Sequence, residues 1–211
     1  MSFVGEPPQH APLIQFQTRG QMLSELLAPG CSILEIGVFR GEFASEIRAR
    51  LAPRLQILCD PWDGPCVSGD ADGNNVVGSD LRYVYDEMVR QTRGDPSWLL
   101  LRGRSPDALK GLADASLDAV YIDGDHSYEG CAADLEAALR LVKPGGYIMG
   151  HDYEINPAKT EARYDFGVKR AVDEFCAKHG LSICAKGMDG CVSYAIHLPA
   201  KEFLGFSGWG C

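Results

Sequence analysis

The sequence predicts an α/β fold in which helices cover both faces of a mostly parallel sheet. Short apolar segments typical of strands alternate with segments whose apolar residues recur at helical spacing. The strand segments are apolar throughout, which is typical of parallel sheets that are buried on both faces. A length of 211 residues suits one domain. We therefore expect residues 1–211 to form a single domain that begins with an N-terminal arm over 1–15.

The predicted elements follow one another in a regular order. Residues 16–30 have the apolar spacing of a helix and end at Pro29 and Gly30, a usual helix exit. Further helices are predicted over 41–53, 80–94, 106–113, 128–142 and 167–180. Strands are predicted over 31–38, 55–60, 97–103, 117–123, 145–152, 181–187 and 191–198, the last two as an antiparallel hairpin. The Gly-rich residues 63–78 are predicted to be a long surface loop and a candidate substrate lid.

Composition and charge exclude several classes of protein. A net charge of -9 argues against tight binding of nucleic acid, which needs a basic surface. No apolar run reaches the roughly 18 to 20 residues of a membrane span. The N-terminal residues also lack the basic segment followed by an apolar segment that is typical of a secretory signal. We therefore expect a cytoplasmic protein that acts on a small molecule, with a homo-oligomer left open.

The eight cysteines form no C-x-x-C pair, which argues against a zinc ribbon. Several lie in apolar runs, so most are expected to be small buried hydrophobic residues in a reducing compartment. The alternative is a disulfide between Cys184 and Cys191.

Ligands of open α/β sheets bind at the carboxyl ends of the strands, so those ends carry the functional prediction. The first strand runs into Glu35, Gly37 and Gly41, a glycine turn that matches neither the dinucleotide fingerprint nor the P-loop. Asp60 ends the second strand and is well placed to accept hydrogen bonds from a ribose diol. Two acids at this edge suit a cationic nucleoside ligand better than a pyrophosphate. The alternative is a plain turn at Gly37 and a cap at Asp60.

Two other residues near the strand ends have open interpretations. Trp62 either flanks an adenine ring or packs in the core. Ser105 follows Gly103 at the end of the third strand and either caps the helix from Pro106 or borders a ligand.

The fourth and fifth strands end in acids and histidines. Asp123 ends one strand and Asp152 the other, and neighbouring strands lie about 4.8 Å apart. Two carboxylates so close repel unless they share a proton or a cation, and oxygen ligands suit Mg²⁺, Mn²⁺ or Ca²⁺. His151 is a candidate nitrogen ligand, and His126 is a candidate general base. The alternative is that these are turn and cap residues.

The segments "ILEIGVFRGEFA", "DPW", "LDAVYIDGDHSYEGCAADLEAALRLVKPGGYIMGHDY" and "GVKRAVDEF" resemble class I S-adenosylmethionine-dependent methyltransferases. The resemblance is to the small-molecule O-methyltransferases that include macrocin O-methyltransferase, and it spans roughly residues 16 to 197. It implies a Rossmann-like, seven-stranded, mostly parallel sheet with an antiparallel last strand. One departure is that His151 precedes Asp152 where relatives often carry two acids or an acid and an amide.

The resemblance also implies roles for residues. Those expected around S-adenosylmethionine are Glu35, Gly37, Val38, Gly41, Asp60, Trp62, Gly103, Arg104, Ser105 and Asp123. Asp123 and Asp152, with His151, are expected to hold Mg²⁺ or Mn²⁺, and His126 matches the catalytic base.

The sequence therefore predicts methyl transfer to a hydroxyl of a sugar-like or natural-product-like small molecule. Three alternatives remain: a metal-independent O- or N-methyltransferase, a cofactor-binding module without catalysis, and an NAD-dependent oxidoreductase. The acceptor is expected to contact the segment that carries Lys159, Arg163 and Tyr164, unless that segment is a solvated loop.

Overall fold

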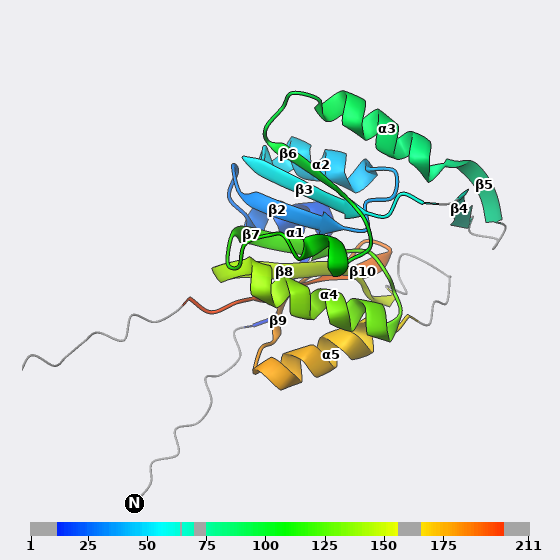
Figure 1. Ribbon diagram of the computed structural model, residues 1–211. Helices are drawn as coiled ribbons and strands as arrows, with labels where there is room; N and C mark the ends of the chain where they lie inside the picture. The colour runs from blue at the N-terminus through cyan, green and yellow to red at the C-terminus, as the bar shows by residue number, and fades with distance from the viewer. Residues whose placement is uncertain (1–11, 64, 70–74, 156–165, 201–211) are drawn as a thin grey trace, which may run out of the picture.

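The computed structural model describes residues 12–63, 65–69, 75–155 and 166–200 (Figure 1). Its main sheet has eight strands in the order β1-β9-β10-β8-β7-β2-β3-β6. The strands are β1 Ile14–Phe16, β2 Ser32–Ile36, β3 Leu55–Asp60, β6 Trp98–Arg102, β7 Leu117–Ile122, β8 Val142–Ile155, β9 Ile183–Gly187 and β10 Cys191–His197. Strand β10 is antiparallel to both of its neighbours, and the other paired strands of this sheet are parallel. The predicted α/β class and the antiparallel last strand are confirmed.

Strand β1 is an addition to the predicted seven. Its three residues, Ile14–Phe16, pair in parallel with β9, so this strand takes the last two residues of the predicted N-terminal arm and the first residue of the helix predicted over 16–30. Three residues are too few for a strand period to be recognised in the sequence. The pairing therefore comes from the tertiary structure.

The helices cover the two faces of the sheet in separate groups (Figure 1). The α-helices are α1 Arg19–Leu26, α2 Glu42–Leu51, α3 Leu81–Thr92, α4 Tyr128–Leu141 and α5 Val168–His179. Helices α1 and α2 pack on one face around Ile33, and α4 and α5 pack on the other around Leu34. Because neighbouring residues of a strand point to opposite faces, the apolar run of β2 supplies both cores. Truncating a fully buried side chain such as Leu135 of α4 would cost about 2–5 kcal/mol.

Two predicted segments differ from the structure. The predicted helix over 106–113 is a single 3-10 turn, η1 Asp107–Leu109. The predicted loop over 63–78 contains two strands, β4 Pro65–Gly69 and β5 Asn75–Asp80, which pair antiparallel. These two strands were not predicted because the segment is rich in glycine and aspartate, which are depleted in strands. The lid role of the segment stays a prediction.

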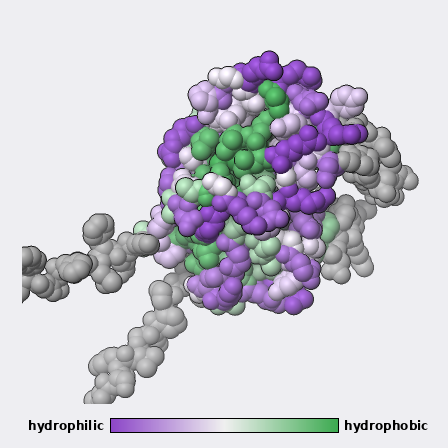
Figure 2. Space-filling model, viewed as in Figure 1, coloured by the Kyte–Doolittle hydropathy of each residue, from purple (hydrophilic) through white to green (hydrophobic). Residues whose placement is uncertain are grey.

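Covering of the sheet is uneven. Figure 2 shows hydrophilic side chains over α4 and α5 and a hydrophobic area on the upper part of the same face, toward β6. Leu99 of β6 is 38% exposed.

The described cysteines carry free thiols, including Cys184 and Cys191, so the disulfide alternative is not formed. Cys31, Cys59 and Cys131 are buried, as their apolar surroundings predict. Within the described ranges, no helix is long and apolar enough to cross a bilayer.

Candidate active site

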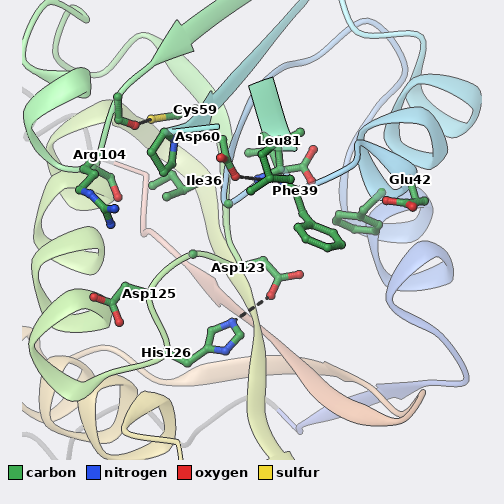
Figure 3. Close-up of a pocket in the computed structure, with 18 of the residues that line it drawn as sticks. Ile36, Phe39, Glu42, Cys59, Asp60, Leu81, Arg104, Asp123, Asp125 and His126 are labelled. Carbon is green, nitrogen blue, oxygen red and sulfur yellow. Dashed lines mark hydrogen bonds and ion pairs between the residues drawn. The ribbon is translucent and has the colours of Figure 1, made fainter. Parts of the chain in front are cut away.

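A cavity of about 750 Å³ lies at the carboxyl ends of the parallel strands (Figure 3). Its wall includes nine of the residues predicted to act in cofactor binding or catalysis: Glu35, Gly37, Val38, Asp60, Gly103, Arg104, Ser105, Asp123 and His126. These residues come from the ends of β2, β3, β6 and β7 and from the loops that follow. The tertiary structure therefore brings together nine residues that are spread over 92 positions of the sequence.

Gly37 is required by packing between strands. Its φ is +84°, and a Cβ atom there would lie 2.0 Å from the backbone oxygen of Asp123. The ends of β2 and β7 approach this closely because Asp123 also donates its backbone N–H to the Ile36 oxygen, at 2.8 Å. Only glycine fits such a position. The close approach of Asp123 is therefore one reason for a glycine at this position.

Asp60 fixes the glycine turn. Its Oδ2 accepts the backbone N–H groups of Val38 and Phe39 at 2.9 and 3.0 Å, and its Oδ1 accepts that of Trp62 at 2.7 Å. An ionised carboxylate has about four acceptor positions, so roughly one remains for a ligand. Asp60 therefore holds the turn in shape while one oxygen position still faces the cavity.

Two predicted cofactor residues do not line the cavity. Trp62 is fully buried beside Val38 and Leu58, and its indole N–H donates to the Phe39 oxygen at 3.1 Å. The packing alternative is thus correct for Trp62, because the ring supports the turn from behind. Gly41 is the N-cap of α2 and faces Met88, while the next residue, Glu42, reaches the cavity.

The end of the cavity near β6 is formed by Gly103, Arg104 and Ser105. The first residue of η1 is preceded by Pro106, which occupies the N-cap position without a side-chain cap bond. Ser105 is therefore not the helix cap that the alternative assumed. Arg104 points toward the solvent and pairs with Asp63 at 3.4 Å, which links the loops after β3 and β6.

The end of the cavity opposite Gly103–Ser105 contains the buried acid Glu35 and the arginine Arg19. Glu35 is 1% exposed and its Oε2 has no hydrogen-bond partner among the described residues. Burial, followed by the charge of Asp123, raises the pKa of Glu35 well above its ordinary value, and Arg19 opposes this rise. The Arg19 guanidinium lies 4.0 Å from the centre of the Phe43 ring and 3.4 Å from Asp123 Oδ2.

Arg19 is a site residue that the sequence did not reveal. It is the first residue of α1, after the cap Thr18, and its partner Asp123 is 104 positions away. An arginine near a helix start is an ordinary surface residue by pattern alone. Only the packing of α1 beside β9 and α2 directs its side chain into the cavity.

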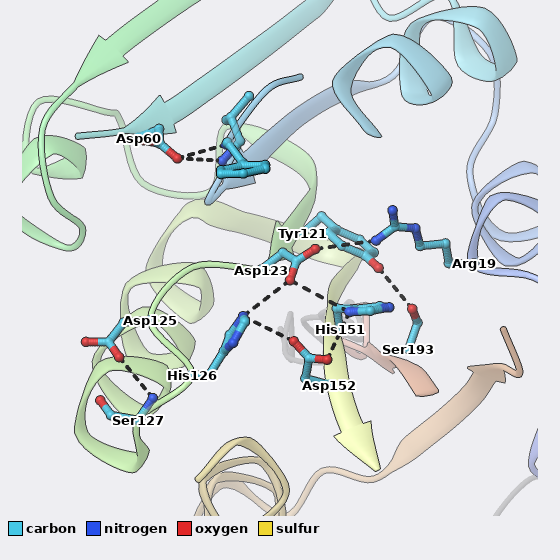
Figure 4. A network of polar contacts seen from close by, with 12 residues as sticks. Arg19, Asp60, Tyr121, Asp123, Asp125, His126, Ser127, His151, Asp152 and Ser193 are labelled. Carbon is cyan, nitrogen blue, oxygen red and sulfur yellow. Dashed lines mark hydrogen bonds and ion pairs between the residues drawn. The ribbon is translucent and has the colours of Figure 1, made fainter. Parts of the chain in front are cut away.

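Two acids and a histidine form a cluster beside the cavity (Figure 4). Asp123, His126 and Asp152 each offer a ligand atom within 4.8 Å of the others. His126 Nε2 lies 3.1 Å from Asp152 Oδ2 and 3.5 Å from Asp123 Oδ1. These are ion-pair distances, and Nε2 completes no aligned hydrogen bond within the described part of the chain. The convergence of Asp123 and Asp152 follows from the predicted pairing of β7 with β8.

His151 lies beside the cluster, and its role as a metal ligand stays a prediction. Its Nδ1 lies 3.2 Å from Asp152 Oδ1 and 3.8 Å from Asp123 Oδ1, outside the compact donor cluster. The histidine that completes the cluster is His126, which was predicted only as a base. The physical reason is that the loop after β7 turns back, and Gly167 fixes it by donating to the His126 backbone oxygen at 2.9 Å.

A bulge in β8 allows His151 and Asp152 to face the same acid. In a regular strand, consecutive side chains point to opposite faces. The pairing of β10 with β8 shifts between Val192 and Tyr194, and Asp152 has a φ of +58°. Aspartate tolerates this left-handed conformation better than most residues, and bulges commonly redirect side chains. The strand therefore supplies two polar groups where a regular one would supply one.

The carboxylates set the protonation of the cluster. Contact with Asp123 raises the pKa of His126 above its ordinary value, burial lowers it, and Asp152 raises it further. Burial alone would raise the pKa of Asp152, but contacts with His151 and His126 hold it below its ordinary value. The carboxylates therefore stabilise the imidazolium cation that would form when His126 accepts a proton.

Comparison with known proteins places this fold and site in a family. A family model described as a methyltransferase domain matches residues 34–153. This is more than half of the chain, and it contains the glycine turn, Asp60 and the whole acid–histidine cluster. The chain belongs to this methyltransferase-domain family. The predicted class, an S-adenosylmethionine-dependent methyltransferase, is confirmed.

Individual relatives agree with the family. The chain is 26% identical to the 8-demethyl-8-(2,3-dimethoxy-alpha-L-rhamnosyl)-tetracenomycin-C 4'-O-methyltransferase of Streptomyces olivaceus, over 82% of this chain and 68% of that protein. Two other curated relatives are uncharacterised and longer, and the chain spans 19% and 51% of their lengths.

Two solved structures illustrate the shared fold. The O-methyltransferase NovP aligns with a TM-score of 0.60 and 21% identity, over 85% of this chain and 76% of that one. The Bacillus cereus O-methyltransferase in complex with SAH aligns with a TM-score of 0.54 and 14% identity, over 84% and 78%.

Proposed function

We propose that the chain transfers the methyl group of S-adenosylmethionine to a hydroxyl of a small molecule, with His126 as the general base. The observation that carries this proposal is the position of His126, which lines the cavity and contacts both Asp123 and Asp152. The carbon–sulfur bond of the sulfonium breaks as a carbon–oxygen bond forms. The hydroxyl proton passes to the imidazole of His126, and S-adenosylhomocysteine is released.

The neighbours of His126 suit this role. An imidazole that accepts a proton becomes a cation, and the two carboxylates stabilise that cation. The Phe166 ring packs against the imidazole at 4.7 Å between centres and holds its orientation. Because the sulfonium methyl is already electrophilic, alignment and proton removal are the main tasks of the protein.

The cavity offers a matching group for each part of the cofactor. The buried Glu35 would receive the ammonium group, and Arg19 would receive the α-carboxylate. The remaining acceptor position of Asp60 would bind the ribose, next to the Val38 backbone. The adenine would then lie toward Gly103–Ser105, at the far end of the wall.

The acid–histidine cluster fits a divalent cation. Asp123 and Asp152 would supply oxygen donors, which suit Mg²⁺, and an imidazole from His151 would favour Mn²⁺. With His151 as the nitrogen donor, His126 stays free to accept a proton. A bound cation would orient the acceptor hydroxyl and lower its pKa.

A metal-independent reaction is the second candidate, and one observation favours it. His126 already contacts both carboxylates that a cation would need. Asp123 and Asp152 would then hold the imidazole and the acceptor rather than an ion. This version also admits a nitrogen acceptor.

For the acceptor we propose a glycosylated natural product or a free sugar derivative. The support is the Streptomyces olivaceus relative, whose name describes 4'-O-methylation of a rhamnosyl-tetracenomycin. The segment with Lys159, Arg163 and Tyr164, predicted to contact the acceptor, lies outside the described residues.

The test is a methylation assay with S-adenosylmethionine and a panel of glycosides, phenols and amines, read out by formation of S-adenosylhomocysteine. We expect transfer to a sugar hydroxyl. Exhaustive chelation should abolish transfer if a cation is required, and unchanged transfer would select the metal-independent version. Binding of S-adenosylhomocysteine without transfer to any acceptor would contradict the proposed O-methylation but leave cofactor binding intact.

A further inference from the structure

Tyr153 of β8 is a buried tyrosine to which the proposed reaction assigns no role. Its hydroxyl donates to Asp173 Oδ1 at 2.7 Å and accepts a hydrogen bond from Lys169 Nζ at 2.9 Å. Lys169 also donates to Asp173 Oδ2, at 2.9 Å. The three side chains therefore form a closed set of hydrogen bonds that joins β8 to α5.

Two ammonium groups also contact the ring of Tyr153. Lys169 Nζ lies 4.4 Å from the ring centre, and Nζ of Lys186 on β9 lies 4.6 Å from it. A cation at such a distance is attracted to the face of an aromatic ring. Lys186 also pairs with Glu154, the residue that follows Tyr153 in β8. This part of β8 is thus held from both α5 and β9, and it cannot shift without the loss of several contacts.

The residue before Tyr153 is Asp152, whose backbone lies in the bulge of β8 with a φ of +58°. A residue other than glycine keeps such a conformation only where its surroundings hold it. The direction of the Asp152 carboxylate depends on this conformation. Because the next residue is anchored to α5, the same contacts hold the carboxylate in its direction toward His126 (Figure 4).

The helix that anchors Tyr153 also holds His126. Gly167, the N-cap of α5, donates its backbone N–H to the His126 backbone oxygen at 2.9 Å. Lys169 and Asp173 lie in the first two turns of the same helix. The N-terminal half of α5 is therefore connected to His126 at one point and to the neighbour of Asp152 at another. The position of this helix relates the two members of the His126–Asp152 contact to each other.

We propose that Tyr153 is a positioning residue for methyl transfer, which sets the distance between His126 and Asp152 by tying the β8 bulge to α5. Tyr153 does not line the cavity, so it acts through Asp152 rather than on the reactants. The inference rests on the proposed function, in which His126 removes the proton of the acceptor hydroxyl. It goes further by assigning the placement of the base and its acid to the contacts of Tyr153 with Lys169 and Asp173.

The first test is Tyr153→Phe, which removes the hydroxyl and keeps the ring. With the panel acceptor that the wild type methylates fastest, kcat should fall by about tenfold or more, because small displacements of catalytic groups are costly. The KM for S-adenosylmethionine and the affinity for S-adenosylhomocysteine should stay within about twofold of the wild type, since the cavity wall is unchanged. Asp173→Ala breaks the same hydrogen bonds from α5 and should give a loss of kcat of similar size.

A double-mutant cycle with Asp152→Ala tests whether Tyr153 acts through Asp152. Once the carboxylate is absent, its position no longer matters, so adding Tyr153→Phe should lower kcat by less than about twofold further. If the two losses of kcat multiply instead, Tyr153 acts independently of Asp152 and the inference is wrong.

The matched control is Tyr128→Phe. It removes a tyrosine hydroxyl that donates to Glu174 of the same helix α5, and it should keep the wild-type kcat. An unchanged stoichiometry of S-adenosylhomocysteine binding, measured by calorimetry, separates misplacement of the base from loss of folded protein. Wild-type kcat in Tyr153→Phe would overturn the inference and leave the proposed function intact. Absence of transfer by the wild type to every acceptor of the panel would refute the proposed function, and this inference with it.

Discussion

His126 Nε2 lies 3.1 Å from Asp152 Oδ2, although the two residues come from different elements. His126 is on the loop after β7, and Asp152 is in the bulge of β8. The contact exists because the loop returns toward the sheet and the bulge turns Asp152 into the left-handed conformation. His126 and Asp152 are therefore placed by two independent departures from regular structure.

Replacing His126 tests its role as the base. His126→Ala should lower kcat by about 10²- to 10⁴-fold, the usual contribution of a positioned acid or base. Affinity for S-adenosylhomocysteine should change little, because the imidazole faces the acceptor side. His179→Ala is the control, since that histidine contacts Glu136 on the outer surface. Wild-type turnover in His126→Ala would eliminate it as the base.

The pH profile should report the carboxylates around His126. The base acts only when neutral, and its pKa is raised, so activity should fall as pH drops through a value above the ordinary 6.5. In Asp152→Asn the acid limb of kcat/KM should move to lower pH, because one of the charges that raises the pKa is gone. A limb that stays in place would show that another group titrates.

Binding of a cation depends on the paired acids. Titration with Mn²⁺, followed by electron paramagnetic resonance, should give at least about tenfold weaker binding in Asp152→Asn, because a ligating oxygen and its charge are lost. Asp114→Asn is the control, since Asp114 pairs with Arg140 on the surface. If the wild type binds no Mn²⁺, the metal-dependent version is wrong.

Arg19 should recognise the amino acid part of the cofactor. Arg19→Gln should weaken S-adenosylhomocysteine binding by about tenfold or more, because a charge-assisted hydrogen bond to the carboxylate is lost. Binding of 5′-methylthioadenosine, which lacks that carboxylate, should be unchanged. Calorimetry with both ligands checks this, and equal losses for the two would point to general damage of the cavity.

Asp134, a buried acid of α4, should make stability fall with pH. Burial raises its folded pKa to about 6 from a reference value of 3.8, so the folded state binds more protons between these values. The free energy of unfolding should therefore decrease as pH rises from about 4 to 6 and then level off, by up to about 3 kcal/mol. Asp134→Asn should lack this decrease. Urea unfolding at several pH values measures the difference, and parallel curves would contradict it.

The acids at the strand ends could be predicted from the sequence because each directly follows an apolar run that is typical of a strand. Asp60 and Asp123 end apolar runs, and pairing of adjacent parallel strands brings such ends to one edge. Trp62 was not predictable in this way, because a tryptophan after a strand fits either a ligand or the core. Its burial depends on α3, which is distant in sequence and packs over it.

The sequence by itself determined the α/β class, the antiparallel last strand and the edge of the sheet where the acids meet. These features could be predicted because the spacing of apolar residues indicates which segments are strands and helices and in what order they follow one another. Only the tertiary structure decided that Arg19 enters the cavity and that His126 lies between Asp123 and Asp152. These placements depend on side-chain packing between elements far apart in the chain, which no local pattern records.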